Sequence, residues 1–195
     1  MLTAVCAAML AGLLFLPSPS SAAAAQSSTD SAPLEFLGFR AGARLDELSL
    51  RLRSSGGSLR CKRSRADGRV SECRAVLRGS ELGPLVDIWI SAIDSLAGVM
   101  TLSGMVDSVQ LEDWRETLQG RYGRVATKVQ GTQRMLQWVR RGRMIRLTWR
   151  LEKQAKVASV SLVDGRVLDG WGRARTSQQR LASPEHPAQP LSRTR

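Results

Sequence analysis

Residues 133–150 read QRMLQWVRRGRMIRLTWR, two strand-like segments joined by the dipeptide Arg141-Gly142. A two-residue turn that contains glycine is a common closure of a β-hairpin. Side chains alternate between the two faces of a strand, so this turn fixes which residues lie opposite one another. The register pairs apolar residues, namely Leu136 with Leu147 and Trp138 with Ile145. We therefore predict a hairpin with one buried face, and we expect Trp138 and Trp149 to be mostly buried on it.

Similar patterns predict further elements on both sides of this hairpin. Two segments carry apolar residues at i, i+3 and i+7, the spacing of an amphipathic helix. These predicted helices are residues 43–54, with Leu45, Leu48 and Leu52, and residues 107–120, with Leu111, Trp114 and Leu118. Apolar runs or alternating patterns predict further strands. They are residues 85–92, 99–103, 125–129 and 156–163.

The order of these elements predicts an α+β fold, because a helix is followed by strands twice along the chain. We expect two helix-then-antiparallel-strands units, residues 34–104 and 105–171, with the helices packed on an antiparallel sheet. One continuous α+β domain without true repetition remains the alternative, since residue spacing does not separate the two arrangements.

A second hairpin is predicted around two cysteines, Cys61 and Cys73. A three-residue loop, 66–68, with Gly68 in the left-handed conformation would place Cys61 directly opposite Cys73. Such a disulfide would restrict the unfolded chain by roughly 3 kcal/mol in the chain-entropy model. The separation is far from the C-x-x-C spacing of exchange chemistry, so we expect a structural bond. Free buried thiols are the alternative.

The two ends of the chain differ in composition from the middle. Residues 5–16 are twelve consecutive apolar residues, too few to span a bilayer, and small residues up to Ala25 satisfy the rule for signal-peptide cleavage. We therefore expect a signal peptide at 1–25, a short linker at 26–33 and a periplasmic or secreted bacterial protein. An uncleaved anchor is the alternative. Residues 172–195 hold few apolar residues and predict a disordered basic tail.

The chain is strongly basic, with 29 Lys and Arg against 17 Asp and Glu. Arginine dominates, asparagine is absent and lysine is rare, a composition typical of genomic codon bias. The surplus is concentrated in residues 121–156, where tryptophans are interleaved with the charges, as in single-strand nucleic-acid or polyanion binders. The candidate anion-binding residues are Arg140, Arg141, Arg143, Arg146 and Arg150. Export favours a polysaccharide, a lipid head group or an acidic protein over nucleic acid as the partner of such a surface.

Catalytic machinery is not predicted. Glu112 and Glu116 share a helix face next to Asp113 and could form a general-acid pair. We expect instead that these carboxylates lie on a solvated helix face. The single histidine, His186, lies between prolines in the predicted tail. No phosphate-binding loop, nucleophile elbow or zinc-binding helix motif occurs. We expect no enzyme, no cofactor and no metal.

The segment Phe39-Arg40-Ala41-Gly42 before a helix, followed by two cysteines twelve positions apart, resembles a family of small exported bacterial domains. These are the domains related to beta-lactamase inhibitor protein and the SmpA/OmlA envelope lipoproteins. The likeness covers the layout of residues 34–163. Ala43-Arg44 replaces the small hydroxyl residue usual near the helix start, and a second cysteine pair is missing. The resemblance implies a non-catalytic protein-binding module.

Three functional hypotheses follow. The first is an exported non-enzymatic binding or structural protein that engages a protein or an envelope component. The alternative is a polyanion-binding module that uses residues 121–156. An enzyme ranks third, because the chain offers few groups for acid-base or metal chemistry.

Overall fold

The computed structural model describes residues 33–80, 83–152 and 155–182. The expected signal peptide at 1–25 lies outside the described residues, as does the expected linker apart from Pro33. The last part of the expected tail, with His186, also lies outside them.

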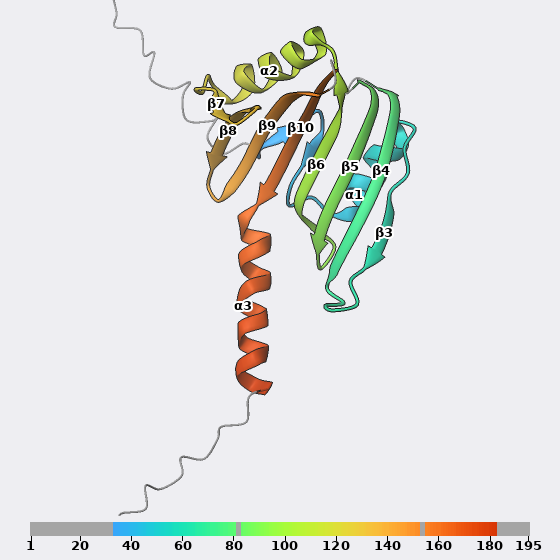
Figure 1. The fold of residues 1–195 in the computed structure, drawn as a ribbon. Helices are drawn as coiled ribbons and strands as arrows, with labels where there is room; N and C mark the ends of the chain where they lie inside the picture. Colours follow the sequence, from blue (N-terminus) through green and yellow to red (C-terminus); the bar gives the residue numbers. More distant parts are fainter. Residues whose placement is uncertain (1–32, 81–82, 153–154, 183–195) are drawn as a thin grey trace, which may run out of the picture. The chain divides into compact units, whose positions relative to one another are not determined.

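Most of the described chain is strand. Eight strands form one antiparallel sheet in the order β3-β4-β5-β6-β10-β9-β8-β7 (Figure 1). They are β3 (Arg60–Arg63), β4 (Val70–Ser80), β5 (Gly83–Ile93), β6 (Leu96–Val106), β7 (Lys128–Gln130), β8 (Gln133–Arg140), β9 (Arg143–Glu152) and β10 (Ala155–Asp164). Two short strands, β1 (Glu35–Phe36) and β2 (Phe39–Arg40), pair with each other. The helices in the described part are α1 (Leu45–Ser54), α2 (Ser108–Tyr122) and α3 (Gly165–Ala182).

The expected α+β fold of two helix-then-strands units is wrong. Strands from 34–104 and 105–171 belong to one sheet, because β6 pairs with β10 over eight consecutive residue pairs from Val99↔Val163 to Val106↔Lys156. Helical and strand periodicity identifies elements one at a time, and it carries no information on which distant strands pair. A third helix, α3, also follows the last strand.

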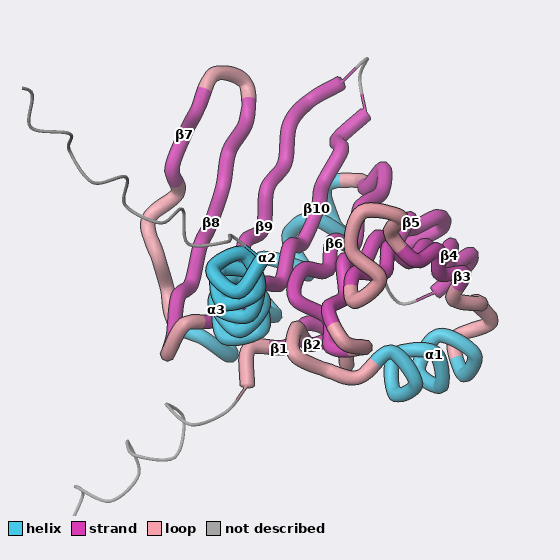
Figure 2. The backbone as a smooth tube through the Cα atoms, turned by 90° about the horizontal axis from the view of Figure 1, so that it is seen from below, coloured by secondary structure: helices cyan, strands magenta, loops and turns pink. Residues whose placement is uncertain are grey.

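The core lies on one face of the sheet, under α1, α2 and the β1–β2 hairpin. Figures 1 and 2 show α1 and β1–β2 on the same side of the sheet. Leu48 and Leu52 of α1 are fully buried there, as are Trp114 and Leu118 of α2. Along the strands every second residue is buried against them, for example Val86, Ile88 and Ile90 in β5. This alternation is the pattern of a sheet covered on one face.

Helix α2 begins as its sequence predicts and is tied to β1 at its end. Asp107 is the N-cap, and its carboxylate accepts a hydrogen bond from Gln110 N at 2.8 Å. At the other end, the Tyr122 hydroxyl donates to Glu35 O and accepts from Glu35 N, both at 2.6 Å. Burial raises the pKa of Tyr122 above its usual value.

The central hairpin has the predicted register. Leu136 pairs with Leu147, and Trp138 pairs with Ile145. Arg141 and Gly142 both have positive φ, as a tight hairpin turn requires. Trp138 is buried, and its indole nitrogen donates to Gly123 O at 2.7 Å.

The second tryptophan of this hairpin is less deeply buried than the first. Trp149 is only partly buried and packs at the rim of the core. It shares the core-facing side of the sheet with Trp138, but α2 does not close over it, and it lines a cavity described below. The alternation of side chains along a strand predicts on which face of the sheet a side chain lies, but not how much of it is buried.

The cysteine hairpin is confirmed. Cys61 and Cys73 lie opposite each other in the β3–β4 ladder and form a disulfide. Cys73 is buried and Cys61, on the edge strand β3, is exposed. The predicted turn is wrong in detail, since Gly68 does not have a positive φ and the connection runs over residues 64–69. Ser64 N donates to Val70 O across its base, so the register survives the different turn.

Helix α3 occupies residues 172–182, where we expected a disordered tail. Two contacts explain its position. Gly98 leaves room for α3, since a Cβ there would approach Leu168 Cδ2 to 2.9 Å. Trp171 Nε1 donates to Asp67 Oδ2 at 2.7 Å. This hydrogen bond, with a further one from Arg69 N, lowers the pKa of Asp67.

The two tryptophans of the central hairpin should differ in their contribution to stability. We expect Trp138→Ala to cost about 3 to 5 kcal/mol, because it empties a fully packed site and removes a hydrogen bond. Trp149→Ala should cost only about 1 to 2 kcal/mol, because its ring is partly exposed. Urea unfolding monitored by far-ultraviolet circular dichroism measures both values. Equal losses for the two variants would contradict the register and depth described here.

Candidate functional site

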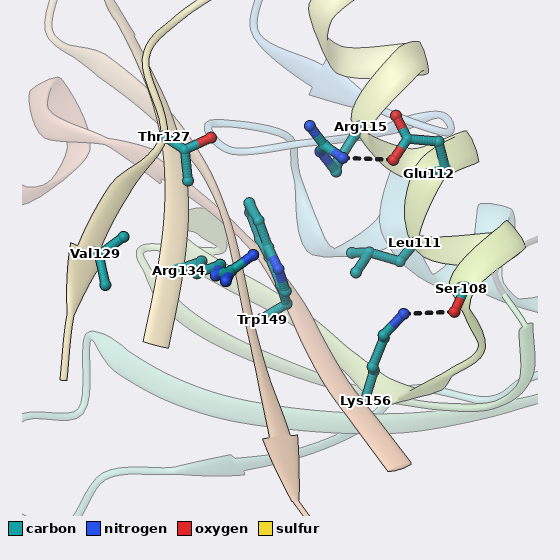
Figure 3. Close-up of a pocket in the computed structure, with 9 residues that line it drawn as sticks. All are labelled: Ser108, Leu111, Glu112, Arg115, Thr127, Val129, Arg134, Trp149 and Lys156. Atoms are coloured by element: carbon teal, nitrogen blue, oxygen red, sulfur yellow. Dashed lines mark hydrogen bonds and ion pairs between the residues drawn. The ribbon is translucent and has the colours of Figure 1, made fainter. Parts of the chain in front are cut away.

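A cavity of about 550 Å³ lies between α2 and the core-facing side of β7, β8, β9 and β10 (Figure 3). We call it the α2–β9 pocket. Trp149 is its largest lining side chain, and Arg134, its cross-strand neighbour on β8, lies beside it. The full lining is Ser108, Leu111, Glu112, Arg115, Thr127, Val129, Arg134, Trp149 and Lys156.

Three cations converge on this pocket against one carboxylate. Arg115 Nη1 binds Glu112 Oε2, and the Arg115 guanidinium lies 5.7 Å from the Trp149 ring centroid. Lys156 Nζ donates to Ser108 Oγ, which leaves its charge uncompensated by any carboxylate bond. Arg134 has no hydrogen-bond or ion-pair partner within the part of the chain that the structure describes. The pocket therefore carries a net positive charge.

Arg115 also holds an unsatisfied donor. Its Nε is buried and has no acceptor among the described residues, although the guanidinium nitrogen Nη1 is bound to Glu112. A buried N–H without an acceptor is costly. The sequence analysis named Glu112 only as a member of a carboxylate group with Asp113 and Glu116. In the structure Glu112 is engaged by Arg115, while Asp113 and Glu116 are exposed on α2.

The five predicted anion-binding arginines do not form one site. Arg140 lies 5.6 Å from the Tyr122 ring centroid and donates to Tyr122 O, and Arg141 forms the β8–β9 turn. The other three are bound elsewhere in the fold. Arg143 pairs with Asp164, Arg146 donates to Gln137 Oε1, and Arg150 pairs with Glu152. Arg140 and Arg143 face each other across the hairpin, while Arg146 and Arg150 lie on the opposite face of the sheet.

Arg143 has a structural partner that the sequence did not reveal. Asp164 is 2% exposed, and its Oδ2 accepts from Arg143 Nε at 2.7 Å. Asp164 Oδ1 accepts from Arg166 N at the start of α3. Gly42, with φ of 81°, passes so close that a Cβ there would lie 2.5 Å from Asp164 Oδ2. The pair therefore fixes the end of β10 against β9, α3 and the entry to α1.

The second candidate surface is the sheet face turned away from α1 and α2, which we call the outer face. Cross-strand pairing aligns its side chains in rows, and one row runs through Arg74, Trp89, Thr101, Ser161 and Arg146. In the middle of the sheet its side chains are small and bonded to each other, with Thr101 Oγ1 and Ser161 Oγ 3.1 Å apart.

Larger side chains surround the small Thr and Ser side chains in the middle of the outer face. Apolar side chains on its outward positions are exposed, namely Val76, Leu85, Met105 and Val139. Trp89 and Met144 are partly exposed there. Basic residues outnumber acidic ones on this face among the strands β4, β5 and β9, with Arg74, Arg78, Arg146 and Arg150 against Glu72, Asp87 and Glu152. In Figure 1 no described helix covers it.

Comparisons with known proteins give no match: no family model, no curated protein and no solved structure matches this chain. None of the helices in the described segments has the length and apolar character needed to cross a membrane. Within the same segments no group of three or more His, Cys, Asp or Glu residues could hold a metal ion.

Removing Arg143 should destabilise the fold more than removing another arginine of the same strand. We expect Arg143→Gln to cost about 2 to 4 kcal/mol, because it leaves the Asp164 carboxylate buried without its close cation. The matched control Arg150→Gln breaks an exposed pair with Glu152 and should cost about 0 to 1 kcal/mol. Thermal and urea unfolding of both variants test this difference. Similar stability of the two would show that the Asp164 pair is not a structural clamp.

Proposed function

We propose that this protein is an exported, non-enzymatic binding protein whose outer face docks on an acidic surface of another protein. The observation that carries the proposal is the outer face itself. It combines exposed apolar side chains with the absence of any covering helix in the described residues. Such surfaces typically serve as interaction sites.

The composition of the outer face supports a protein as the partner. Trp89 lies between Arg74 and Thr101 in one cross-strand row. Tryptophan and arginine are the residues most often found at the energetic centre of protein interfaces. The flat, bonded hydroxyl groups beside them offer no deep cavity, and a shallow apolar surface with a polar rim suits a protein better than a small molecule.

The charge of this face supports an acidic partner. On β4, β5 and β9 four arginines exceed three carboxylates on this face, so the potential there favours an acidic surface and accelerates its approach. The disulfide and the apolar N-terminal leader support export, because disulfides persist outside the cytoplasm. The resemblance to beta-lactamase inhibitor protein-like domains points to the same class of function.

Polyanion binding through residues 121–156 is the competing proposal. Arg146 and Arg150 lie on the outer face, but both already bind other side chains, Gln137 and Glu152. The apolar groups of the outer face would add little to the binding of a flexible anionic polymer, whose affinity comes from counterion release. The observations therefore favour a protein.

Site-specific photocrosslinking in cells that make the protein distinguishes the two faces. We introduce p-benzoylphenylalanine in place of Val139, which is 62% exposed on the outer face, and separately in place of Val109, which is 70% exposed on α2. Val139 should give a discrete protein adduct and Val109 should not. Arg74→Glu, added to the Val139 variant, should reduce that adduct because it reverses a charge at the interface.

Two outcomes would contradict the proposal. Adducts of equal yield from both positions would mean that the outer face is not selective. Absence of an adduct from the Val139 position, together with salt-sensitive retention of the purified protein on heparin, would favour a polyanion binder instead. Identification of the adduct by mass spectrometry then shows whether the captured protein is acidic.

A further inference from the structure

We propose that the α2–β9 pocket binds a small organic anion that carries a flat apolar group. This site is separate from the outer face, because Trp149 and Arg134 belong to the core-facing side of the sheet, under α2. The inference therefore does not depend on the proposed protein partner. It rests on the shape, the aromatic wall and the charge of the pocket.

The cations set the charge of the ligand. Arg134 has no partner in the described chain, and its guanidinium points toward Trp149 (Figure 3). Lys156 reaches the same cavity from β10 and, among the described residues, is bound only to the neutral Ser108 hydroxyl. A carboxylate, sulfonate or phosphate between them would gain charge-assisted hydrogen bonds from two directions.

Arg115 adds a third cation beside the pocket. Its guanidinium lies 5.7 Å from the Trp149 ring centroid. Its Nε is buried, so this nitrogen is not open to a ligand in the pocket. Glu112 already holds Nη1 of this side chain, so the guanidinium is fixed in place before a ligand arrives.

The apolar walls of the pocket indicate the shape of the uncharged part of the ligand. Trp149 presents a partly exposed indole, and Leu111 and Val129 add aliphatic surface around it. A volume of about 550 Å³ lies within the range of small-molecule sites. Aromatic rings stack favourably on an indole, so the matching ligand has a planar apolar body next to its anionic group.

A pair of fluorescent probes tests the proposal. The probe 8-anilinonaphthalene-1-sulfonate has the expected chemistry, and N-phenyl-1-naphthylamine is the same aromatic body without the sulfonate. With the full folded chain at low salt, the sulfonate probe should bind at one saturable site and more tightly than the neutral probe. Arg134→Gln and Lys156→Gln should each weaken the sulfonate probe by about five- to tenfold, and tenfold corresponds to about 1.4 kcal/mol. Binding of the neutral probe should not change.

Two further variants protect this test from an effect on folding. Arg134→Lys keeps the charge and should restore most of the affinity that Arg134→Gln loses. Arg53→Gln removes the same charge from an exposed position on α1 and should leave both probes unaffected. Trp149→Leu should weaken both probes, since it removes the flat wall without removing a cation.

Competition identifies the source of the ligand. Displacement of the sulfonate probe by 2-naphthoate supports a free aromatic acid, while displacement by dihexanoylphosphatidylglycerol and not by 2-naphthoate would contradict the flat apolar group. Failure of both to displace it would overturn the proposal. So would equal binding of charged and neutral probes, or unchanged sulfonate binding in Arg134→Gln and Lys156→Gln.

Discussion

The pairing of β6 with β10 is the constraint on which the rest of the fold depends. These strands lie in the middle of the sheet, each with a neighbour on both sides, and they join residues from distant parts of the chain along eight pairs. Their inward side chains, among them Met100, Leu102, Val160 and Leu162, are fully buried under the helices. Their outward side chains are mostly small, and Thr101 and Ser161 bond across the ladder. Without this ladder the sheet would present two open edges, which invite pairing with other chains.

The Arg143–Asp164 ion pair lies next to the end of the β6–β10 ladder where Val99 pairs with Val163. Asp164 ends β10 and binds Arg143 at the start of β9, while Gly42 passes within contact distance on its way to α1. Gly42 N also donates to Ala97 O at the start of β6. One buried carboxylate thus connects both central strands with the first helix. The consequence for function is indirect: the outer face and the α2–β9 pocket lie on opposite sides of β9, and both keep their shape only while that strand is fixed.

Local features could be predicted from the sequence, and long-range ones could not. The helices, the register of Cys61 with Cys73 and that of Leu136 with Leu147 follow from apolar spacing and turns, which act over a few residues. The β6–β10 ladder joins residues fifty or more positions apart, so no local pattern contains it. α3 was missed because its start is anchored by distant groups, Asp67 and the space at Gly98. Charge along the sequence located residues 121–156 correctly as basic, but strand alternation sent Arg146 to one face and Arg134 to the other. The pocket exists because α2 covers Trp149 only in part, and this packing could not be predicted from the sequence.

Native-state hydrogen exchange, followed by mass spectrometry, tests the central claim most directly. If the β6–β10 ladder makes the sheet a single cooperative unit, then amides of β5, β6, β9 and β10 exchange together, at the slow rate set by global unfolding. The edge strands β3 and β7 should exchange faster, because each is paired on one side only. A result in which β4 to β6 stay protected while β8 to β10 exchange in a separate and faster step would contradict the account, because the two halves would then open independently.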